Sequence, residues 1–272
     1  MPENPETPEP VLTLRKGPVL TVILNRPRRK NAMTDDAWAL LGETLRAARS
    51  DEAVKAVVIT GAGGDFCAGA DLRGARSRQH PLDRMNRLGD TAQALYDMPK
   101  PVIAKVEGVA VGAGWNLALG CDLVVASTTA RFAQIFARRG LSPDFGGSWL
   151  LPRIVGLQQA KRLALLAEFV DADEAARLGL VTWVKPAEEI DTFVEDLAAR
   201  LAGGPPVAMA QAKLLLHQAA GQIFHEALDN ESRAQVINFA TDAPAARWAF
   251  VEGTEPCFEG RWLLSHQTED RT

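Results

Sequence analysis

The chain has 272 residues, of which 47% are hydrophobic and 24% are charged, as in ordinary globular proteins. This length allows one large domain, or a domain with a helical appendage. The formal net charge of −4 argues against a nucleic-acid partner, because nucleic-acid binders usually carry a basic face. Three scattered cysteines, Cys67, Cys121 and Cys257, are too few for a disulfide framework or a zinc site. We expect reduced core thiols and no metal.

The N-terminal residues 1–10, MPENPETPEP, are acidic and rich in proline. They do not have the pattern of a signal or transit peptide, and we expect a disordered lead-in. No apolar run approaches the roughly 20 residues of a membrane span. The sequence therefore predicts a cytoplasmic protein without a membrane partner.

Residues 11–14 and 19–24 alternate in polarity around a glycine, which predicts a hairpin. The basic stretch NRPRRKNAM follows at residues 25–33, and on its own it is typical of a solvated loop. Thr34 then caps a helix, with two aspartates in the first turn, where the helix dipole favours negative charge. An apolar face follows at helical spacing in this helix: Trp38, Leu41, Leu45 and Ala48.

Two apolar runs, residues 56–60 and 102–106, each lead into glycine-rich sequence, and both are predicted to be buried strands. The first loop, GAGGDFCAGADL at residues 61–72, has neither the Walker nor the dinucleotide spacing. The second leads through Gly108, Gly112 and Gly114 into a helix from Trp115. Backbone N–H groups at a helix start favour a phosphate, or an oxyanion that develops during a reaction. A turn that needs glycine only for packing is an equally good interpretation at this point.

The remaining pattern predicts a mobile segment at residues 73–90, a helix at 92–98, and strands at 123–126, 131–133 and 180–184. Helices are expected from Ser148, at 157–167 and at 173–179, and almost continuously from 190 to about 251. The breaks at residues 203–206 and 221 separate a core at 11–200 from a helical segment at 201–272. Asp144 lies in a turn cluster, where a structural role and a catalytic one are about equally probable on local grounds.

Several motifs in order resemble the crotonase family of enoyl-CoA hydratases and isomerases, over residues 11–262: NRPRRKNAM, ITGAGGDFCAGADL, PVIAKVEGVAVGAGWNLALGCD, ARFAQIFARRGLSPDFGGSWLLPRIVG and EPCFEG. The resemblance implies an α/β fold: a spiral core of β-β-α units with an α-helical C-terminal oligomerisation segment that builds trimers, often paired into hexamers. It also implies a coenzyme A (CoA) thioester as substrate, with no permanently bound cofactor.

In the family, two backbone N–H groups hold the thioester oxygen, and the motifs place them on Ala70 and Ala113. Both residues follow strands in loops of small side chains, where backbone can approach a ligand closely. The resemblance assigns the CoA moiety to a set of basic and backbone groups: Lys30, Ala32, Ala68, Asp71, Leu72 and Arg73. Where relatives carry basic residues near the C-terminus, this chain offers only the apolar contacts Phe250 and Phe258.

Hydratases of the family hold a water between two glutamates, and the motifs place these positions, which face the substrate, at Asn116 and Phe136. Neither side chain is a general acid or base of the required kind. Other members use an aspartate in the Pro-Asp-x-Gly-Gly turn, as the proton shuttle of isomerases or the nucleophile of a dehalogenase. Asp144 occupies that position, and we expect a double-bond isomerase. A hydratase, hydrolase or dehalogenase variant using Asp144 is the alternative, and a non-catalytic CoA-binding or RNA-binding scaffold is an alternative of another class.

Overall fold

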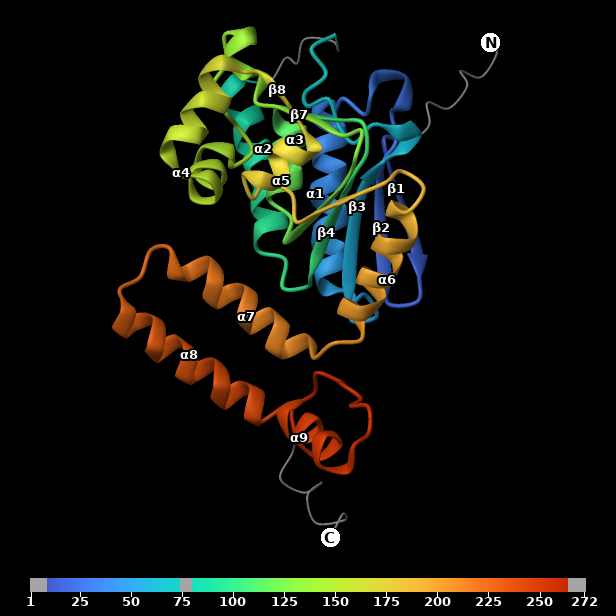
Figure 1. The fold of residues 1–272 in the computed structure, drawn as a ribbon, viewed down its shortest axis with the longest axis vertical. Helices are drawn as coiled ribbons and strands as arrows, with labels where there is room; N and C mark the ends of the chain where they lie inside the picture. The colour runs from blue at the N-terminus through green and yellow to red at the C-terminus, as the bar shows by residue number, and fades with distance from the viewer. Residues whose placement is uncertain (1–8, 74–79, 264–272) are drawn as a thin grey trace.

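A six-stranded sheet forms the centre of the computed structural model, which describes residues 9–73 and 80–263 (Figure 1). Its strands are arranged in the order β1-β2-β3-β4-β6-β9. They span Val11–Lys16, Val19–Leu24, Ala56–Gly61, Val102–Val106, Leu123–Ser127 and Trp183–Lys185. β1 and β2 form the predicted antiparallel hairpin, and every later pairing in this sheet is parallel. The carboxyl ends of the parallel strands therefore meet at one edge.

A second, three-stranded sheet has the order β5-β7-β8, formed by Val109–Val111, Arg131–Ala133 and Phe169–Asp171. In two successive units, β4-β5-α3 and β6-β7-α4, the first strand joins the large sheet and the second joins the small one. The loop after β3 follows the same path, because Cys67 bridges to Ala110 of β5. This repeated β-β-α path is the predicted spiral.

Helices cover both faces of the large sheet. α1 (Asp35–Ser50) and α2 (Pro81–Tyr96) belong to the main core with alternate strand residues such as Val57 and Ile59, while α6 (Ile190–Ala202) packs on the others, including Val58. α1 starts as predicted, since the Thr34 side chain accepts a hydrogen bond from the Ala37 N–H. Burying each large apolar side chain of this helix contributes about 1.5–3 kcal/mol.

The next helices build the end of the core that carries the second sheet. α3 (Ala113–Leu119) is entirely buried. α4 (Gly147–Leu166) is two helices joined at a kink, where Gly156 has φ 72° and ψ 162°. α5 (Ala172–Arg177) follows β8. Three 3₁₀ helices lie in the loops: η1 (Pro27–Arg29), η2 (Ala62–Gly64) and η3 (Ile135–Arg139).

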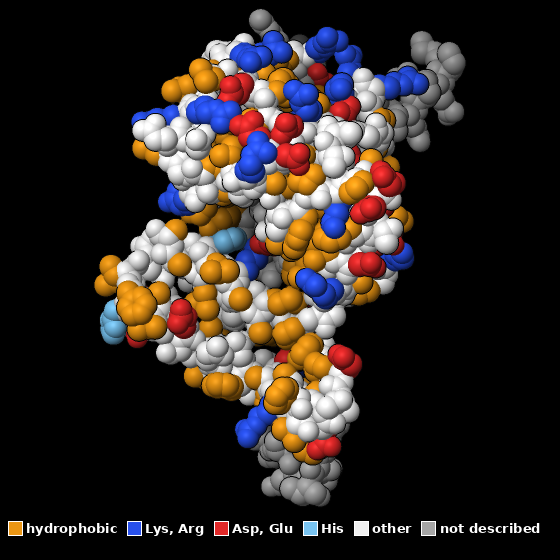
Figure 2. All heavy atoms as spheres, viewed as in Figure 1, with side chains coloured by type: hydrophobic (Ala, Val, Ile, Leu, Met, Phe, Trp, Pro, Cys, Tyr) orange, Lys and Arg blue, Asp and Glu red, His pale blue; other side chains and the backbone are white. Residues whose placement is uncertain are grey.

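The last three helices form an arm that extends away from the sheets, drawn in orange and red in Figure 1. α7 (Pro206–Ala219) and α8 (Phe224–Phe239) lie side by side, and α9 (Ala243–Glu252) follows. The arm is tied to the core by an ion pair between Lys213 and Asp122 at 2.8 Å and by stacking of His217 on Tyr96. Figure 2 shows many hydrophobic side chains over the lower part of the molecule, where the arm lies.

The helix predicted at residues 92–98 instead starts at Pro81, so the expectation of a mobile segment is wrong for residues 81–90. The reason is that this first half packs little: nine of its ten residues are exposed, which leaves almost no apolar periodicity. Residues 74–79 and the lead-in at 1–8 lie outside the described residues. Among the strands, β9 starts at Trp183 rather than 180, and β5 and β8 were not predicted. The C-terminal helical pattern also has a break that was not predicted, between Phe239 and Ala243.

Within residues 9–73 and 80–263, every helix is too short or too polar to span a membrane.

Candidate active site

A cavity of about 560 Å³ opens where the glycine loops, η3 and the Asp144 turn meet. Seven of the predicted site residues lie in its wall: Lys30, Ala68, Ala70, Leu72, Ala113, Phe136 and Asp144. Apolar side chains that the sequence did not single out complete it, among them Ile135, Leu141 and Phe169. Positions far apart in the chain thus come together around one mainly apolar cavity.

The first glycine loop is held on both sides by backbone hydrogen bonds. Gly69 O accepts from Met33 N, and Asp71 N donates to Met33 O, each at 2.8 Å, while Cys67 exchanges two bonds with β5. Among the described residues, the Ala70 N–H between these anchors makes no backbone hydrogen bond. It is therefore a fixed donor at the cavity wall.

The second donor is at the start of α3. Ala113 is the first residue of this helix, so its N–H has no partner within the helix. Gly112 precedes it with φ 57° and ψ −127°, a conformation that glycine adopts without strain. A Cβ on Gly69 would lie 2.7 Å from Val111 O and 3.5 Å from Ala113 N. Glycine at 69 therefore lets the two donor loops come close together.

Asp144 brings a carboxyl group to the same cavity. Burial raises its pKa to about 6, because taking a carboxylate out of water disfavours the charged form. Its Oδ1 atom is buried and has no hydrogen-bond partner among the described residues. The turn behind it has Phe145 at φ 48° and Gly146 at φ 77°, and Phe145 packs on Trp38 of α1 with ring centroids 4.9 Å apart. The carboxyl is thus presented from a well-anchored turn.

Asn116 does not lie in the cavity wall, contrary to the role predicted from its position. Its side chain is fully buried. Nδ2 donates to the backbone oxygen of Asp144, and Oδ1 accepts from Gln134 Nε2, both at 2.8 Å. Asn116 therefore contacts the turn that carries Asp144, not the space in front of it. Phe136, at the other expected glutamate position, does line the cavity.

Basic side chains lie at the opening of the cavity. Lys30 contributes a mostly exposed ammonium group, 3.3 Å from the Asp65 carboxylate. Arg138 and Arg139 also line the opening. They were not among the predicted site residues, although they lie together within the motif ARFAQIFARRGLSPDFGGSWLLPRIVG. Three cationic side chains at one opening suit the phosphates of a large anionic ligand.

The other predicted CoA-binding groups are placed behind or beside the wall. Asp71 pairs with Arg26 at 2.8 Å, and Arg26 also donates to the Ala32 carbonyl oxygen. Burial alone would raise the pKa of Asp71, but hydrogen bonds from the Arg73 N–H and from Arg26 outweigh it and lower the pKa. The Asp71 carboxylate is thus engaged by Arg26 and by the Arg73 N–H within the loop. The Arg73 side chain is exposed.

Phe250 and Phe258 are not among the residues that line the cavity. Both lie in the C-terminal segment, and Phe250 is 87% exposed on α9. Within one chain the arm therefore does not bring them to the site.

The cysteines do not supply a nucleophile to the site. Cys67 is fully buried behind the first loop, and burial raises the pKa of its thiol to about 12, so it is protonated at neutral pH. Cys121 is also buried, but Cys257 is exposed, which corrects the expectation of three core thiols. No group of three or more possible metal ligands occurs in residues 9–73 and 80–263.

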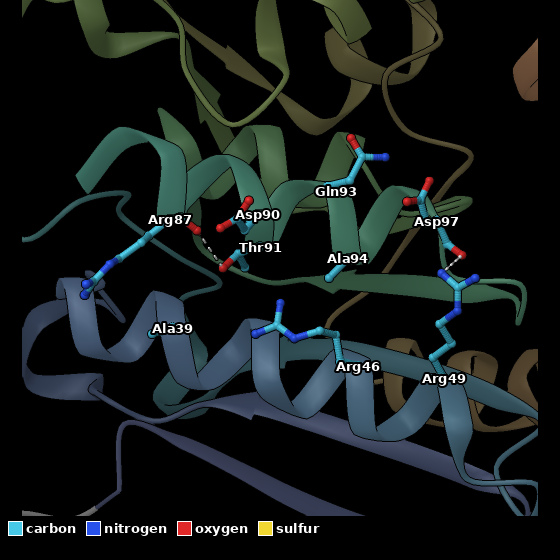
Figure 3. A pocket seen from close by; sticks show the side chains of 9 residues that line it. All are labelled: Ala39, Arg46, Arg49, Arg87, Asp90, Thr91, Gln93, Ala94 and Asp97. Atoms are coloured by element: carbon cyan, nitrogen blue, oxygen red, sulfur yellow. Dashed lines mark hydrogen bonds between the residues drawn. The ribbon is translucent and has the colours of Figure 1, made fainter. Parts of the chain in front are cut away.

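A second cavity, of about 430 Å³, is a groove between α1 and α2. Figure 3 shows its three arginines, Arg46, Arg49 and Arg87, together with two aspartates. Arg49 donates to the backbone oxygen of Asp97. The groove mixes both signs of charge, and neither glycine loop contributes to its lining, so it is separate from the site.

The cavity wall combines Ala70 and Ala113 from two glycine loops, one carboxyl group of raised pKa and three cationic side chains at the rim. Backbone N–H groups in such loops can stabilise an oxyanion, and a cationic rim suits an anionic ligand. The family model described as enoyl-CoA hydratase/isomerase matches residues 15–261. The chain belongs to this family, the crotonase superfamily, whose enzymes act on acyl-CoA thioesters.

Relatives cover nearly the whole chain. An Escherichia coli protein named 1,2-epoxyphenylacetyl-CoA isomerase is 35% identical, over 91% of this chain and 97% of its own. The crystal structure of a putative enoyl-CoA hydratase from Streptomyces coelicolor has a TM-score of 0.88 at 36% identity, covering 96% of this chain and 98% of that one. A putative enoyl-CoA hydratase from Thermobifida fusca in complex with acetoacetyl-CoA has a TM-score of 0.80 at 32% identity, covering 85% and 95%. These likenesses agree with the predicted family and fold.

Proposed function

We propose that the protein is an enoyl-CoA double-bond isomerase in which Asp144 is the acid and base. The observation that carries the proposal is that, among the described residues, Asp144 is the one carboxyl group that lines the cavity. Its pKa of about 6 suits proton transfer in both directions near neutral pH.

In this mechanism the thioester oxygen accepts hydrogen bonds from the Ala70 and Ala113 N–H groups. The Asp144 carboxylate takes a proton from the carbon between the thioester and a 3,4 double bond, and the electron pair moves into a dienolate. Negative charge collects on the thioester oxygen, where each fixed donor contributes about 10²- to 10³-fold to the rate. The protonated Asp144 then returns its proton to the far carbon, which leaves a conjugated 2,3 double bond.

Adding water is a poorer match to the same groups. A hydratase must hold and activate a water molecule in front of the double bond, but the Asn116 amide is engaged behind the wall. Phe136 makes the remaining wall apolar. A hydratase, hydrolase or dehalogenase variant that uses Asp144 remains the alternative, and similar structures carry hydratase names. The isomerase name of the Escherichia coli relative supports proton transfer between carbons.

The CoA moiety is proposed to lie at the cationic rim, with its phosphates near Lys30, Arg138 and Arg139. The acetoacetyl-CoA complex of the Thermobifida fusca protein supports a thioester ligand for this fold. Arg73, Ala32, Ala68, Asp71 and Leu72 stay proposed neighbours of the CoA moiety. A non-catalytic scaffold would have no need for two presented donors and a perturbed carboxyl group.

Self-association as a trimer or hexamer through residues 201–272 is also part of the proposal, and in such an assembly Phe250 and Phe258 would reach a neighbouring subunit's site. The cytoplasmic location stays a prediction from the sequence.

Two substrates distinguish isomerisation from hydration. The enzyme is given a 3-enoyl-CoA and, separately, a 2-enoyl-CoA, and the absorbance of the conjugated thioester is followed. An isomerase raises the absorbance with the first substrate and changes it little with the second. Rapid loss of absorbance with the 2-enoyl-CoA would instead identify a hydratase.

A further inference from the structure

Behind the cavity wall, two buried amide side chains form a continuous chain of hydrogen bonds to the Asp144 turn. Gln134, just before η3, is 1% exposed and donates through Nε2 to Asn116 Oδ1. Asn116, on α3, is fully buried and donates through Nδ2 to the Asp144 backbone oxygen. That oxygen also accepts from Gly147 N at 2.9 Å. The contacts link the elements carrying Ala113, Phe136 and Asp144.

The amide of Asn116 is also packed tightly against this turn. A Cβ on Gly147 would lie 2.2 Å from Asn116 Nδ2 and 2.5 Å from its Cγ. These distances are far below van der Waals contact, so a glycine is required at 147 for Asn116 to reach the Asp144 carbonyl. Asn116 and Gly147 are therefore fitted to one another.

We propose that Asn116, oriented by Gln134, is a positioning residue that holds the Asp144 main chain so that the carboxyl group stays directed into the cavity. This inference rests on the proposed role of Asp144 as acid and base. The Asp144 carbonyl can only accept, so it requires the Asn116 nitrogen to face it, and the Asn116 oxygen then faces Gln134 Nε2. Gln134 Oε1 is buried without a hydrogen-bond partner among the described residues, so this bond to Asn116 is the one polar contact that sets the Gln134 amide. Orientation of one amide thus fixes the other.

The chemistry explains why an amide rather than a carboxylate stands at 116. An ionised carboxylate has only acceptors, so it has no hydrogen to give to the Asp144 carbonyl oxygen and would repel it. Asn116 is therefore not simply a lost glutamate. It supplies a donor that the Asp144 turn needs and that a glutamate lacks.

Asn116→Ala tests the inference. The turn loses one of two bonds to its carbonyl, and kcat for a 3-enoyl-CoA is expected to fall about tenfold to 100-fold, as for a misplaced catalytic group, while KM stays within about twofold. Gln134→Ala should cause a smaller fall in kcat. The double variant should be no slower than Asn116→Ala alone, because Gln134 acts through Asn116. Additive losses in kcat would overturn this order of action.

A readout independent of turnover keeps the test separate from the proposed function. With ¹³C-labelled aspartate, the Asp144 carboxyl signal is the one missing from the spectrum of Asp144→Asn, and in the wild type it should titrate near pH 6. In folded Asn116→Ala, water reaches the loosened turn and the midpoint should fall toward about 4. An unchanged midpoint with unchanged kcat would overturn the inference. Full activity of Asp144→Asn would instead defeat the proposed function and leave the titration to decide the positioning role.

Ser127→Ala is the matched control for losing a buried hydrogen bond. Ser127 is fully buried on β6 and its hydroxyl pairs with Thr129, outside the cavity wall. This variant should lose stability without changing the Asp144 titration or the kcat. A shift of the titration in Ser127→Ala as large as that in Asn116→Ala would show a general effect of destabilisation and overturn the assignment.

Discussion

The helices around the cavity and the helices of the arm are both rich in apolar residues, but their surroundings differ. Every residue of α3, Ala113–Leu119, is buried, whereas in α7, which the structure describes completely, no residue is buried. The arm and the segment after it expose a large set of apolar side chains: Leu214, Leu216, Ile223, Phe224, Leu228, Val236, Phe239, Trp248, Phe250, Val251, Trp262 and Leu263. A single chain therefore encloses the cavity wall with its own residues but leaves many apolar side chains of the arm uncovered.

Among changes at the cavity, Asp144→Asn should have the largest effect. It keeps the shape of the side chain and removes the base, so kcat for a 3-enoyl-CoA should fall about 10²- to 10⁴-fold. Because burial raises the folded-state pKa of Asp144 above the unfolded one, wild-type stability is lost as pH rises from about 4 through about 6. The variant lacks this loss, so thermal unfolding at pH 7 should show a protein at least as stable. Turnover within threefold of wild type would remove Asp144 from the mechanism.

Ala113→Pro should cost about 10²-fold or more in kcat, because it removes one of the two oxyanion donors. Proline is tolerated at the first position of a helix, which is where Ala113 lies. The ring adds bulk at the cavity wall, so Ala113→Gly is the matched control: it keeps the N–H and should retain most of the activity. Equal activity of the proline and glycine variants, both folded, would rule out this donor.

On the arm, Phe224→Asp combined with Phe239→Lys should convert the assembly into monomers while leaving each chain folded. The two side chains are 79% and 67% exposed at opposite ends of α8. The new charges match the helix dipole, so the helix itself is not weakened. Sedimentation should show the wild type at three or six chains and the variant at one. Leu14→Lys, at a 62% exposed position on β1, should stay assembled, and a wild type that is monomeric at micromolar concentration would contradict the proposal.

Lys30→Ala should have the smallest effect, a rise in KM of about threefold to tenfold with kcat nearly unchanged. An exposed ammonium group that contacts a phosphate contributes modestly, and salt screens it, so the difference in KM should shrink at high ionic strength. Lys16→Ala is the control, since Lys16 is also exposed and paired with a carboxylate but lies on β1. If the KM of Lys30→Ala equals that of the control, Lys30 does not contact the CoA phosphates.

Much of the fold could be predicted because buried strands and helices have a regular spacing of apolar residues in the sequence. The runs at 56–60 and 102–106 are strands β3 and β4, and Thr34 caps α1. The first half of α2 was missed because it faces solvent, and β5 because three residues beside glycines resemble a turn. Local pattern carries little signal where an element is short or unburied.

The candidate site could be predicted where a residue is identified by its position in a sequence motif. Ala70, Ala113 and Asp144, which the motifs singled out one by one, lie in one cavity wall. The partners of Asn116 could not be predicted, because Gln134 and the Asp144 carbonyl meet it only in the folded chain. Likewise, nothing in the sequence says that Arg138 and Arg139 reach the rim while Phe250 does not. Such contacts depend on tertiary packing.

The central claim is that the Asp144 carboxyl group transfers the proton between two carbons of the substrate. The most direct test is the pH dependence of kcat/KM for a 3-enoyl-CoA. This ratio reports ionisations of the free enzyme, and the base is active only when ionised. Activity should therefore rise with pH through a midpoint of about 6 and then level off, and Asn116→Ala should move the midpoint lower. A profile that is flat between about pH 4.5 and 8, in a wild-type protein that stays folded throughout, would contradict the account.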